Sequence, residues 1–322
     1  MTLRVALVNN MPDGAFEETE RQFGDLLRAG AGREVVLERY VLAGIPRGDA
    51  VRVVIGERYR DVRHLHRRPP DGLIVTGTEP KSANLADEVY WPALQELLWW
   101  ARAEVPSAVL SCLAAHAALQ SFDGLVRRRL PVKCSGVFPQ RLDASSPLMA
   151  GVGPVALAHS RLNDVAATDL EAKGYRVLAA SGEAGWTVAT AELGQCLFVL
   201  LQGHPEYQRL TLLREYRRDV RRYLSGQGAY PALPVGYLRP DGAALLGRFA
   251  QMATSGPASP ALMERFPFEE AGRHISCNWR RAARALFGNW VKELGRRVDS
   301  WDGRAAMARG ATGASAYTEK GA

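Results

Sequence analysis

The sequence predicts an α/β fold, a doubly wound, mostly parallel sheet with helices on both faces. Three short apolar runs support this prediction, because each ends in a turn and is followed by a helical pattern: residues 3–8, 72–77 and 107–110. Strands that alternate with helices across short turns are typical of a parallel sheet. A chain of 322 residues, 47% hydrophobic and 23% charged, is long enough to bury such a core.

The N-terminal half supplies the strands and helices in alternation. The strand at 3–8 leads through a loop to an amphipathic helix over 16–27, and a second strand is expected at 34–42. Residues 44–71 are polar and predicted to be mostly loop, and five arginines within 58–68 lie around two histidines. We interpret them either as a flap near a phosphate-bearing substrate or as a solvated basic surface. A loop over 78–88 and a helix over 90–102 follow the third predicted strand.

The C-terminal half is less regular. Short strands and turns over about 125–190 predict an irregular or antiparallel insert. An apolar strand run from Cys196 stops at Gly203, and a strongly charged helix is expected over 210–224. A Gly/Pro-rich connector over 225–240 precedes a last amphipathic helix over 278–294. We therefore expect a single domain over residues 1–296 and a flexible tail over 297–322.

Cys112 lies between the strand at 107–110 and an Ala/Leu-rich helix over 113–122 that Gly124 is placed to end. A side chain on such a turn points out of the top of the sheet, and the helix N-terminus favours a thiolate. These are the two conditions that a nucleophilic cysteine needs. A small buried core residue is the alternative interpretation.

His204 and Glu206 follow the apolar run that starts at Cys196, and Pro205 between them ends the strand. A thiol nucleophile needs a base, and the base needs an orienting carboxylate. Carboxyl ends of parallel strands share one edge of a sheet, where sites form. We therefore predict a catalytic Cys112–His204–Glu206 site, against the alternative of a loop histidine and a solvated carboxylate.

The same edge offers an oxyanion hole. Gly77 ends the strand that should lie beside the one before Cys112. We expect backbone N–H groups at Gly77, Thr78 and Leu113 to stabilise a developing oxyanion.

Composition excludes several classes of function. No apolar run approaches the roughly 18 residues of a membrane helix, and the N-terminus lacks a signal-peptide pattern. The net charge of +7 comes from scattered arginines, without the basic and aromatic interleaving of nucleic-acid binders. The cysteines have no paired spacing, so neither a metal site nor a disulfide framework is predicted: Cys112, Cys134, Cys196 and Cys277. We expect a cytoplasmic protein.

Several further motifs bear a family resemblance. The chain resembles the homoserine O-acyltransferases of the MetA type, usually called homoserine O-succinyltransferases, from about residue 3 to about residue 291. The motifs are the Asn-Asn-Met-Pro loop at 9–12, residues 71–77, 90–92, the Cys112 turn, 133–137, 159–161, 203–207, 218–219 and 289–290. The resemblance implies a glutamine amidotransferase-like fold and a homodimer.

The resemblance also implies roles. Cys112 matches the nucleophile that takes an acyl group from acyl-CoA as a thioester, His204 the general base and Glu206 its orienting carboxylate. Lys133, Ser160 and Arg218 match substrate-binding positions, where the cations suit a carboxylate. The implied reaction is ping-pong transfer to the hydroxyl of L-homoserine in methionine biosynthesis, with no bound cofactor.

Lys81 matches a family position linked to the choice of acyl group, and a lysine there suits the free carboxylate of succinate. The resemblance therefore favours succinyl-CoA over acetyl-CoA as co-substrate. The alternative interpretation is an exposed loop lysine. The chain departs from the family pattern at Leu113, where an aromatic residue is usual, and at His116, where glutamine is common.

Three functions remain open at this stage. The first is the acyltransferase, with homoserine or serine as acceptor. The second is a glutamine amidotransferase, although that class usually has Gly-x-Cys-x-Gly where this chain has Leu110 and Ala114. The third is a binding or redox-sensing protein that retains the fold and a reactive cysteine.

Overall fold

A computed structural model describes residues 2–30, 32–276 and 279–315 of the chain. The strands are β1 (Leu3–Val8), β2 (Val35–Val41), β3 (Arg60–Asp61), β4 (Gly72–Val75), β5 (Ser107–Ser111), β6 (Arg128–Pro139), β7 (Arg141–Leu142), β8 (Ala156–Asp164), β9 (Arg176–Ser181), β10 (Gly185–Leu193) and β11 (Cys196–Leu201). The α-helices are α1 (Phe16–Gly30), α2 (Asp49–Arg58), α3 (Trp91–Glu104), α4 (Leu113–Asp123), α5 (Ala167–Ala172), α6 (Thr211–Leu224), α7 (Pro240–Thr254), α8 (Phe268–Arg273) and α9 (Arg280–Ser315).

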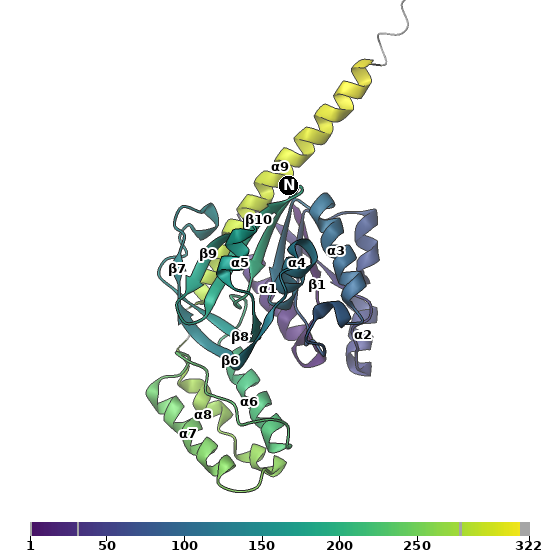
Figure 1. Ribbon diagram of the computed structural model, residues 1–322. Coiled ribbons are helices and arrows are strands. Elements are labelled where there is room, and N and C mark those ends of the chain that lie inside the picture. Colours follow the sequence, from purple (N-terminus) through teal and green to yellow (C-terminus); the bar gives the residue numbers. More distant parts are fainter. Residues whose placement is uncertain (1, 31, 277–278, 316–322) are drawn as a thin grey trace, which may run out of the picture.

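A mostly parallel sheet forms the centre of the molecule (Figure 1). In the described ranges its strand order is β3-β2-β1-β4-β5-β11-β10-β9-β7. The pairings from β3 to β11 are parallel, and those from β11 to β7 are antiparallel. The chain leaves β1 in one direction to build β2 and β3 and returns on its other side as β4. The predicted doubly wound α/β fold is confirmed.

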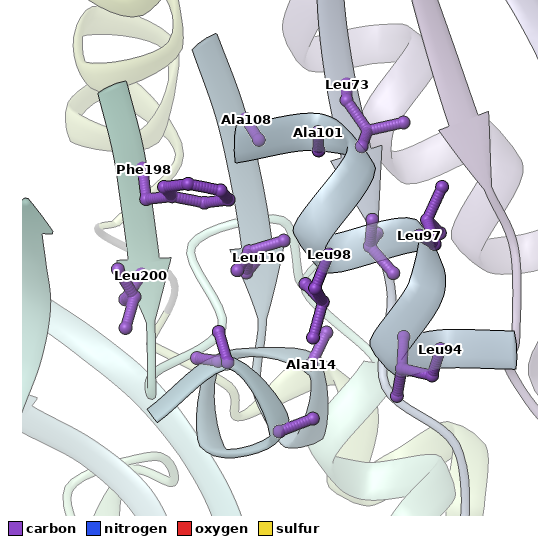
Figure 2. Close-up of a cluster of buried hydrophobic side chains, with 14 of the residues drawn as sticks. Leu73, Leu94, Leu97, Leu98, Ala101, Ala108, Leu110, Ala114, Phe198 and Leu200 are labelled. Atoms are coloured by element: carbon purple, nitrogen blue, oxygen red, sulfur yellow. The ribbon is translucent and has the colours of Figure 1, made fainter. Parts of the chain in front are cut away.

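Helices cover both faces of this sheet, as predicted. On one face α3 and α4 pack on β4, β5 and β11, and Figure 2 shows the interdigitated side chains, among them Leu98, Leu110 and Phe198. On the other face α1 and α9 pack through Phe23, Phe287 and Trp290. Because both faces are covered, β4, β5 and β11 are buried throughout and mostly apolar, with Ser107 and Ser111 at the ends of β5.

Gly72 shows how closely α9 packs on the sheet. A Cβ atom at this first residue of β4 would come within 2.7 Å of the Leu294 side chain and 3.3 Å of Trp290. Any larger residue would push the helix away from the strand. Trp290 is fixed further by the hydrogen bond that its Nε1 donates to Ser107 Oγ at 2.9 Å.

The predicted insert is largely regular. Residues 125–190 form β6 and β8, which pair as an antiparallel two-stranded sheet, and β7, β9 and β10, which extend the main sheet. The antiparallel alternative was therefore right and the irregular one wrong. A register shift between Arg129 and Cys134 interrupts the β6–β8 ladder. Such interruptions hide the alternation that marks a strand in the sequence.

Two other predictions were wrong. Residues 44–71, expected as loop, contain α2, β3 and a 3-10 helix over Val62–Arg67. Val51, Val54 and Ile55 have helical spacing that the surrounding arginines obscured. The last helix does not end at residue 294: α9 continues to Ser315, so much of the expected tail is helical. Alanine and arginine favour this continuation.

Helices α6, α7 and α8 form a lobe at the end of the molecule below β6 and β8, and α9 projects from the opposite side (Figure 1). The segment 241–276 had no structural prediction. Its lobe has a separate apolar core that includes Tyr216, Leu246 and Phe249. Cys277 and Asn278, and residues 316–322 of the predicted tail, lie outside the described residues. Among the described helices, none is long and apolar enough to cross a membrane.

His116 on α4 is a buried titratable group in this core. The side chain is 3% exposed, and its Nε2 lies 2.9 Å from Gln202 Oε1. Burial lowers the pKa of His116 to about 4, although the Gln202 hydrogen bond acts to raise it. The histidine is therefore neutral near pH 7.

We expect His116→Gln to reduce the loss of stability in acid. A pKa depressed from about 6.5 in the unfolded chain gives stability that is present above pH 6.5 and lost as the pH falls toward 4. When the pH falls from 7 to 5, this histidine lowers the free energy of unfolding by about 2 kcal/mol. Urea titrations at both pH values measure the difference. His64→Gln, at an exposed histidine, is the matched control, and equal acid sensitivity of all three proteins would contradict the expectation.

Candidate active site

The site lies at the carboxyl ends of three neighbouring strands. β5 pairs with β4 on one side and with β11 on the other, so Leu110 lies beside Val75 and Leu200. The chain therefore leaves the sheet at one edge as the loop after Val75, as Cys112 and as the turn before His204. This is the edge at which the sequence placed the site.

Cys112 occupies a strained turn between β5 and α4. Its φ of +52° and ψ of −108° are unusual for a residue with a side chain, and among the described non-glycine residues it alone has a positive φ. The Cys112 amide donates to the Leu201 carbonyl of β11 at 2.6 Å. The turn directs the thiol away from the sheet at the N-terminus of α4, where free amides and the helix dipole favour negative charge.

Gly77 lies directly against the first turn of α4. A Cβ at Gly77 would be 3.1 Å from both the amide nitrogen and the Cβ of Leu113. The Asn-Asn-Met-Pro loop fixes this position, because the Asn10 amide donates to Thr76 Oγ1 at 2.8 Å. The structure thus brings Gly77 beside the Leu113 amide, and Thr78 lines the same cavity.

His204 and Glu206 form a buried pair after β11. His204 Nδ1 lies 2.8 Å from Glu206 Oε1, and the side chains are 7% and 4% exposed. Ser111 Oγ also donates to Glu206 Oε1, at 3.3 Å. The imidazole stacks on the ring of Tyr207 with 4.3 Å between centroids. The carboxylate therefore fixes the orientation of the ring, and Nε2 is left to act on the thiol.

Charge governs the protonation of His204. Burial acts to lower its pKa, but the negative charges of Glu206 and Cys112, together with the hydrogen bond to Glu206, outweigh burial and hold the pKa well above its ordinary range. Among the described residues, no nitrogen or oxygen partner reaches Nε2. The resting site therefore favours an imidazolium next to the Cys112 sulfur.

The two-stranded sheet β6–β8 supports His204 from behind. The His204 amide donates to the Ala158 carbonyl at 2.7 Å. Gly203 fits between β8 and β10, since a Cβ there would come within 2.6 Å of Thr187 and 3.1 Å of His159 Nε2. Arg161 donates to His159 Nδ1 at 2.7 Å, which leaves Nε2–H to donate to Thr187 Oγ1 at 3.0 Å. Burial, with the charge of Arg161, holds the pKa of His159 well below its usual value.

Lys133, Ser160 and Arg218 gather around two carboxylates of α6. Lys133 Nζ lies 2.7 Å from Asp219 Oδ2 and 3.8 Å from Glu215 Oε2. Arg218 Nε donates to Asp219 Oδ1 at 3.0 Å, and the Ser160 hydroxyl donates to Glu215. Burial acts to raise the pKa of Asp219, but Lys133 and Arg218 outweigh it and hold the pKa below its usual range.

One cavity of about 1320 Å³ joins all these groups. Every residue predicted for the site lines it: Gly77, Thr78, Lys81, Cys112, Leu113, Lys133, Ser160, His204, Glu206 and Arg218. Lys81 is exposed at this wall. None of residues 44–71 lines the cavity, which counts against the flap interpretation of that segment. The volume exceeds the 300–1,000 Å³ or so of ordinary small-molecule sites, and suits two substrates.

The sequence did not single out several residues of the cavity. Asp219 and Glu215 belong to the strongly charged helix predicted over 210–224 and had no predicted role, yet both line the cavity and pair with its cations. Tyr207 donates to Glu215 Oε1 at 2.7 Å while it stacks on His204. Two signals in the sequence pointed to these residues. The four-residue spacing of Glu215 and Asp219 places them on one helix face, and Tyr207 and Asp219 lie in the family motifs at 203–207 and 218–219.

The described part of the chain contains no cluster of three or more histidine, cysteine or carboxylate side chains arranged to hold a metal ion. Cys112, Cys134 and Cys196 are free thiols.

Comparison with known proteins gives a consistent family. Residues 1–297 match the model of the homoserine O-succinyltransferase family. The chain is 42% identical over 295 residues to a homoserine O-succinyltransferase from Rhodopseudomonas palustris, covering 91% of this chain and 88% of that protein. A protein of the same name from Methylorubrum extorquens is 42% identical over 298 residues, covering 92% and 88%.

Among solved structures, a glutamine amidotransferase from Methylobacillus flagellatus is 16% identical and has a TM-score of 0.47, covering 91% of this chain and 95% of that one. The family assignment depends on the sequence matches instead. They extend over nearly the whole chain and confirm the resemblance drawn from its motifs, so the chain belongs to the homoserine O-succinyltransferase family.

Proposed function

We propose that this protein is an acyl-CoA-dependent O-acyltransferase that transfers a succinyl group from succinyl-CoA to the hydroxyl of L-homoserine. The observation that carries the proposal is Cys112 at a strained strand–helix turn beside the buried His204–Glu206 pair. Family membership supports the same reaction. The other cavity residues then act as substrate contacts, and no bound cofactor or metal enters the proposal.

The first half-reaction acylates Cys112. The thiolate attacks the carbonyl carbon of acyl-CoA, forming a C–S bond and an oxyanion that the amides of Thr78 and Leu113 can stabilise beside Gly77. Collapse of the tetrahedral intermediate breaks the bond to the CoA sulfur. His204, protonated in the resting site, donates its proton to the departing thiolate. The products are a Cys112 thioester and CoA-SH.

Acylation itself prepares His204 for the second half-reaction. A thioester carries no charge, so one of the two anions that raise the pKa of His204 is lost when Cys112 is acylated. The neutral imidazole can then accept the hydroxyl proton of the acceptor as that oxygen attacks the thioester carbonyl. Release of Cys112 as a thiolate, with His204 protonated, restores the resting state.

The cations of the cavity suit the acceptor. Homoserine carries an α-carboxylate and an α-ammonium group, and the Lys133, Arg218, Asp219 and Glu215 cluster offers charges of both signs. We propose that Lys133, Arg218 and Ser160 bind the substrate, and that Lys81, exposed at the wall, lies near the acyl group.

Cavity residues extend from Met11 to Val235, which supports residues 1–296 as one catalytic unit. We also propose that the protein is cytoplasmic and forms a homodimer.

The acyl-enzyme provides the decisive experiment. We expect intact-protein mass spectrometry after incubation with succinyl-CoA, without acceptor, to show one succinyl adduct, which homoserine then discharges. Cys112→Ala should form no adduct and lose at least about a thousandfold in transfer rate while remaining folded, because it removes the nucleophile. Cys134→Ala is the matched control, since this half-buried thiol lines the same cavity.

Other results would point elsewhere. An acetyl adduct without a succinyl adduct would make the protein an acetyltransferase, and discharge by serine but not homoserine would change the acceptor. Ammonia release from glutamine would favour an amidotransferase. Undiminished transfer by Cys112→Ala would rule out the thioester mechanism.

Glu206→Gln should change the pH dependence of acylation. The carboxylate raises the pKa of His204, so the neutral amide lets that pKa fall, and the imidazolium is lost at lower pH. The alkaline decline of CoA release in a single turnover should therefore move down by about one pH unit or more. Stopped-flow detection of the released thiol measures it. An unshifted profile with a uniformly lower rate would show that Glu206 acts only in folding.

A further inference from the structure

Arg127 is a buried guanidinium in the cavity wall, between α4 and β6. The residue is 8% exposed. Its Nη2 donates to the Ser82 and Ala83 carbonyls at 2.9 and 3.2 Å, and its Nε donates to Ala83 at 3.3 Å. The remaining guanidinium nitrogen, Nη1, makes no hydrogen bond to the described residues, and they do not enclose it fully. That nitrogen therefore has donors free to face the cavity that Cys112 shares.

Arg127 differs from most cations of the cavity in that it forms no direct ion pair with a described residue. Within the described ranges, no carboxylate oxygen lies within 4.0 Å of its guanidinium nitrogens. Lys133 and Arg218 each pair with Asp219, and Arg222 pairs with Glu79 at 2.7 Å. Lys81 is exposed, so water screens its charge.

Arg127 shares the cavity with the nucleophile Cys112. Burial lowers the pKa of Arg127, whereas the neighbouring Tyr90, Cys112 and Glu88 act to raise it. The guanidinium therefore responds to charge on the sulfur. A buried cation without a paired anion is costly, and a bound anion next to the reacting sulfur removes that cost.

We propose that Arg127 binds the distal carboxylate of the acyl group carried on Cys112 and thereby selects a dicarboxylic acyl donor over a neutral one. The inference rests on the proposed acyltransferase function and identifies its specificity-determining residue. In a succinyl thioester, two methylene groups separate the carbonyl on the sulfur from the carboxylate. The planar guanidinium suits such a carboxylate, and its buried setting strengthens the pairing relative to exposed Lys81.

Arg127→Gln tests this assignment. We compare single-turnover acylation of Cys112 by succinyl-CoA and by butyryl-CoA, which has an acyl chain of the same length without the carboxylate. The wild-type protein should prefer succinyl-CoA, and Arg127→Gln should reduce this preference by about 10- to 100-fold through the succinyl rate alone. Arg129→Gln, at an exposed arginine of the same cavity, is the matched control and should keep the preference. Lys81→Gln, at the residue proposed to lie near the acyl group, separates the two possible carboxylate sites.

Each other outcome has a distinct meaning. Equal losses with both donors would show that Arg127 only holds the Ser82–Ala83 loop, and loss of preference in Lys81→Gln alone would move the carboxylate to Lys81; either overturns the inference and leaves the acyltransferase function intact. No adduct in the wild-type protein from any acyl-CoA would overturn the proposed function.

A second measurement needs no variant. Succinate, unlike butyrate, should slow alkylation of wild-type Cys112 by iodoacetamide. Equal effects of the two anions would overturn the assignment even if Arg127→Gln failed to fold.

Discussion

The hydrogen bond from the Cys112 amide to the Leu201 carbonyl joins the two parts of the site. It connects the end of β5 to the end of β11 at the point where Cys112 adopts a φ of +52°. A non-glycine residue holds such a conformation only where its surroundings fix it. Here they consist of five parallel pairings along β5 and β11, the helix that starts at Leu113, and Gly77 pressed against that helix. The nucleophile and its base are thus held by one rigid edge of the sheet.

The base depends on a second layer of structure. β11 delivers His204 to the edge, but the strand pair β6–β8 fixes its backbone through Ala158 and its neighbourhood through His159. His159 is itself held neutral by burial and by the donor of Arg161 on its Nδ1. Only a glycine fits at position 203 between these layers. The insert is therefore a support for the catalytic histidine as well as a wall of the cavity.

The cations at the two ends of the cavity differ in whether a carboxylate pairs with them. Near the helical lobe, the cations of Lys133 and Arg218 are compensated by Asp219, so that region can exchange partners with a substrate that carries both signs. Near Cys112, Arg127 has no such partner among the described residues, and its burial strengthens the attraction between the guanidinium and a bound anion. This arrangement gives the two ends of the proposed reaction different electrostatic surroundings.

The strand–helix order and the turns at Cys112 and His204 could be predicted from the sequence, because they depend on local periodicity and on Gly and Pro at fixed positions. That information was enough to place Cys112, His204 and Gly77 at one edge, since neighbouring parallel strands end together. Local pattern failed where arginines masked a helix over 49–58 and where a register shift interrupted β6.

Long-range packing settles which charges face the cavity. Asp219 and Glu215 look like solvated helix charges, and Arg127 looks like one arginine among many, until α6 and the loop before β6 fold against the cavity. Burial and pairing depend on residues distant in the chain, such as Lys133 for Asp219 and the Ser82 carbonyl for Arg127. The chemistry of the nucleophile could thus be read locally, whereas the electrostatics that select its substrates arise from long-range packing.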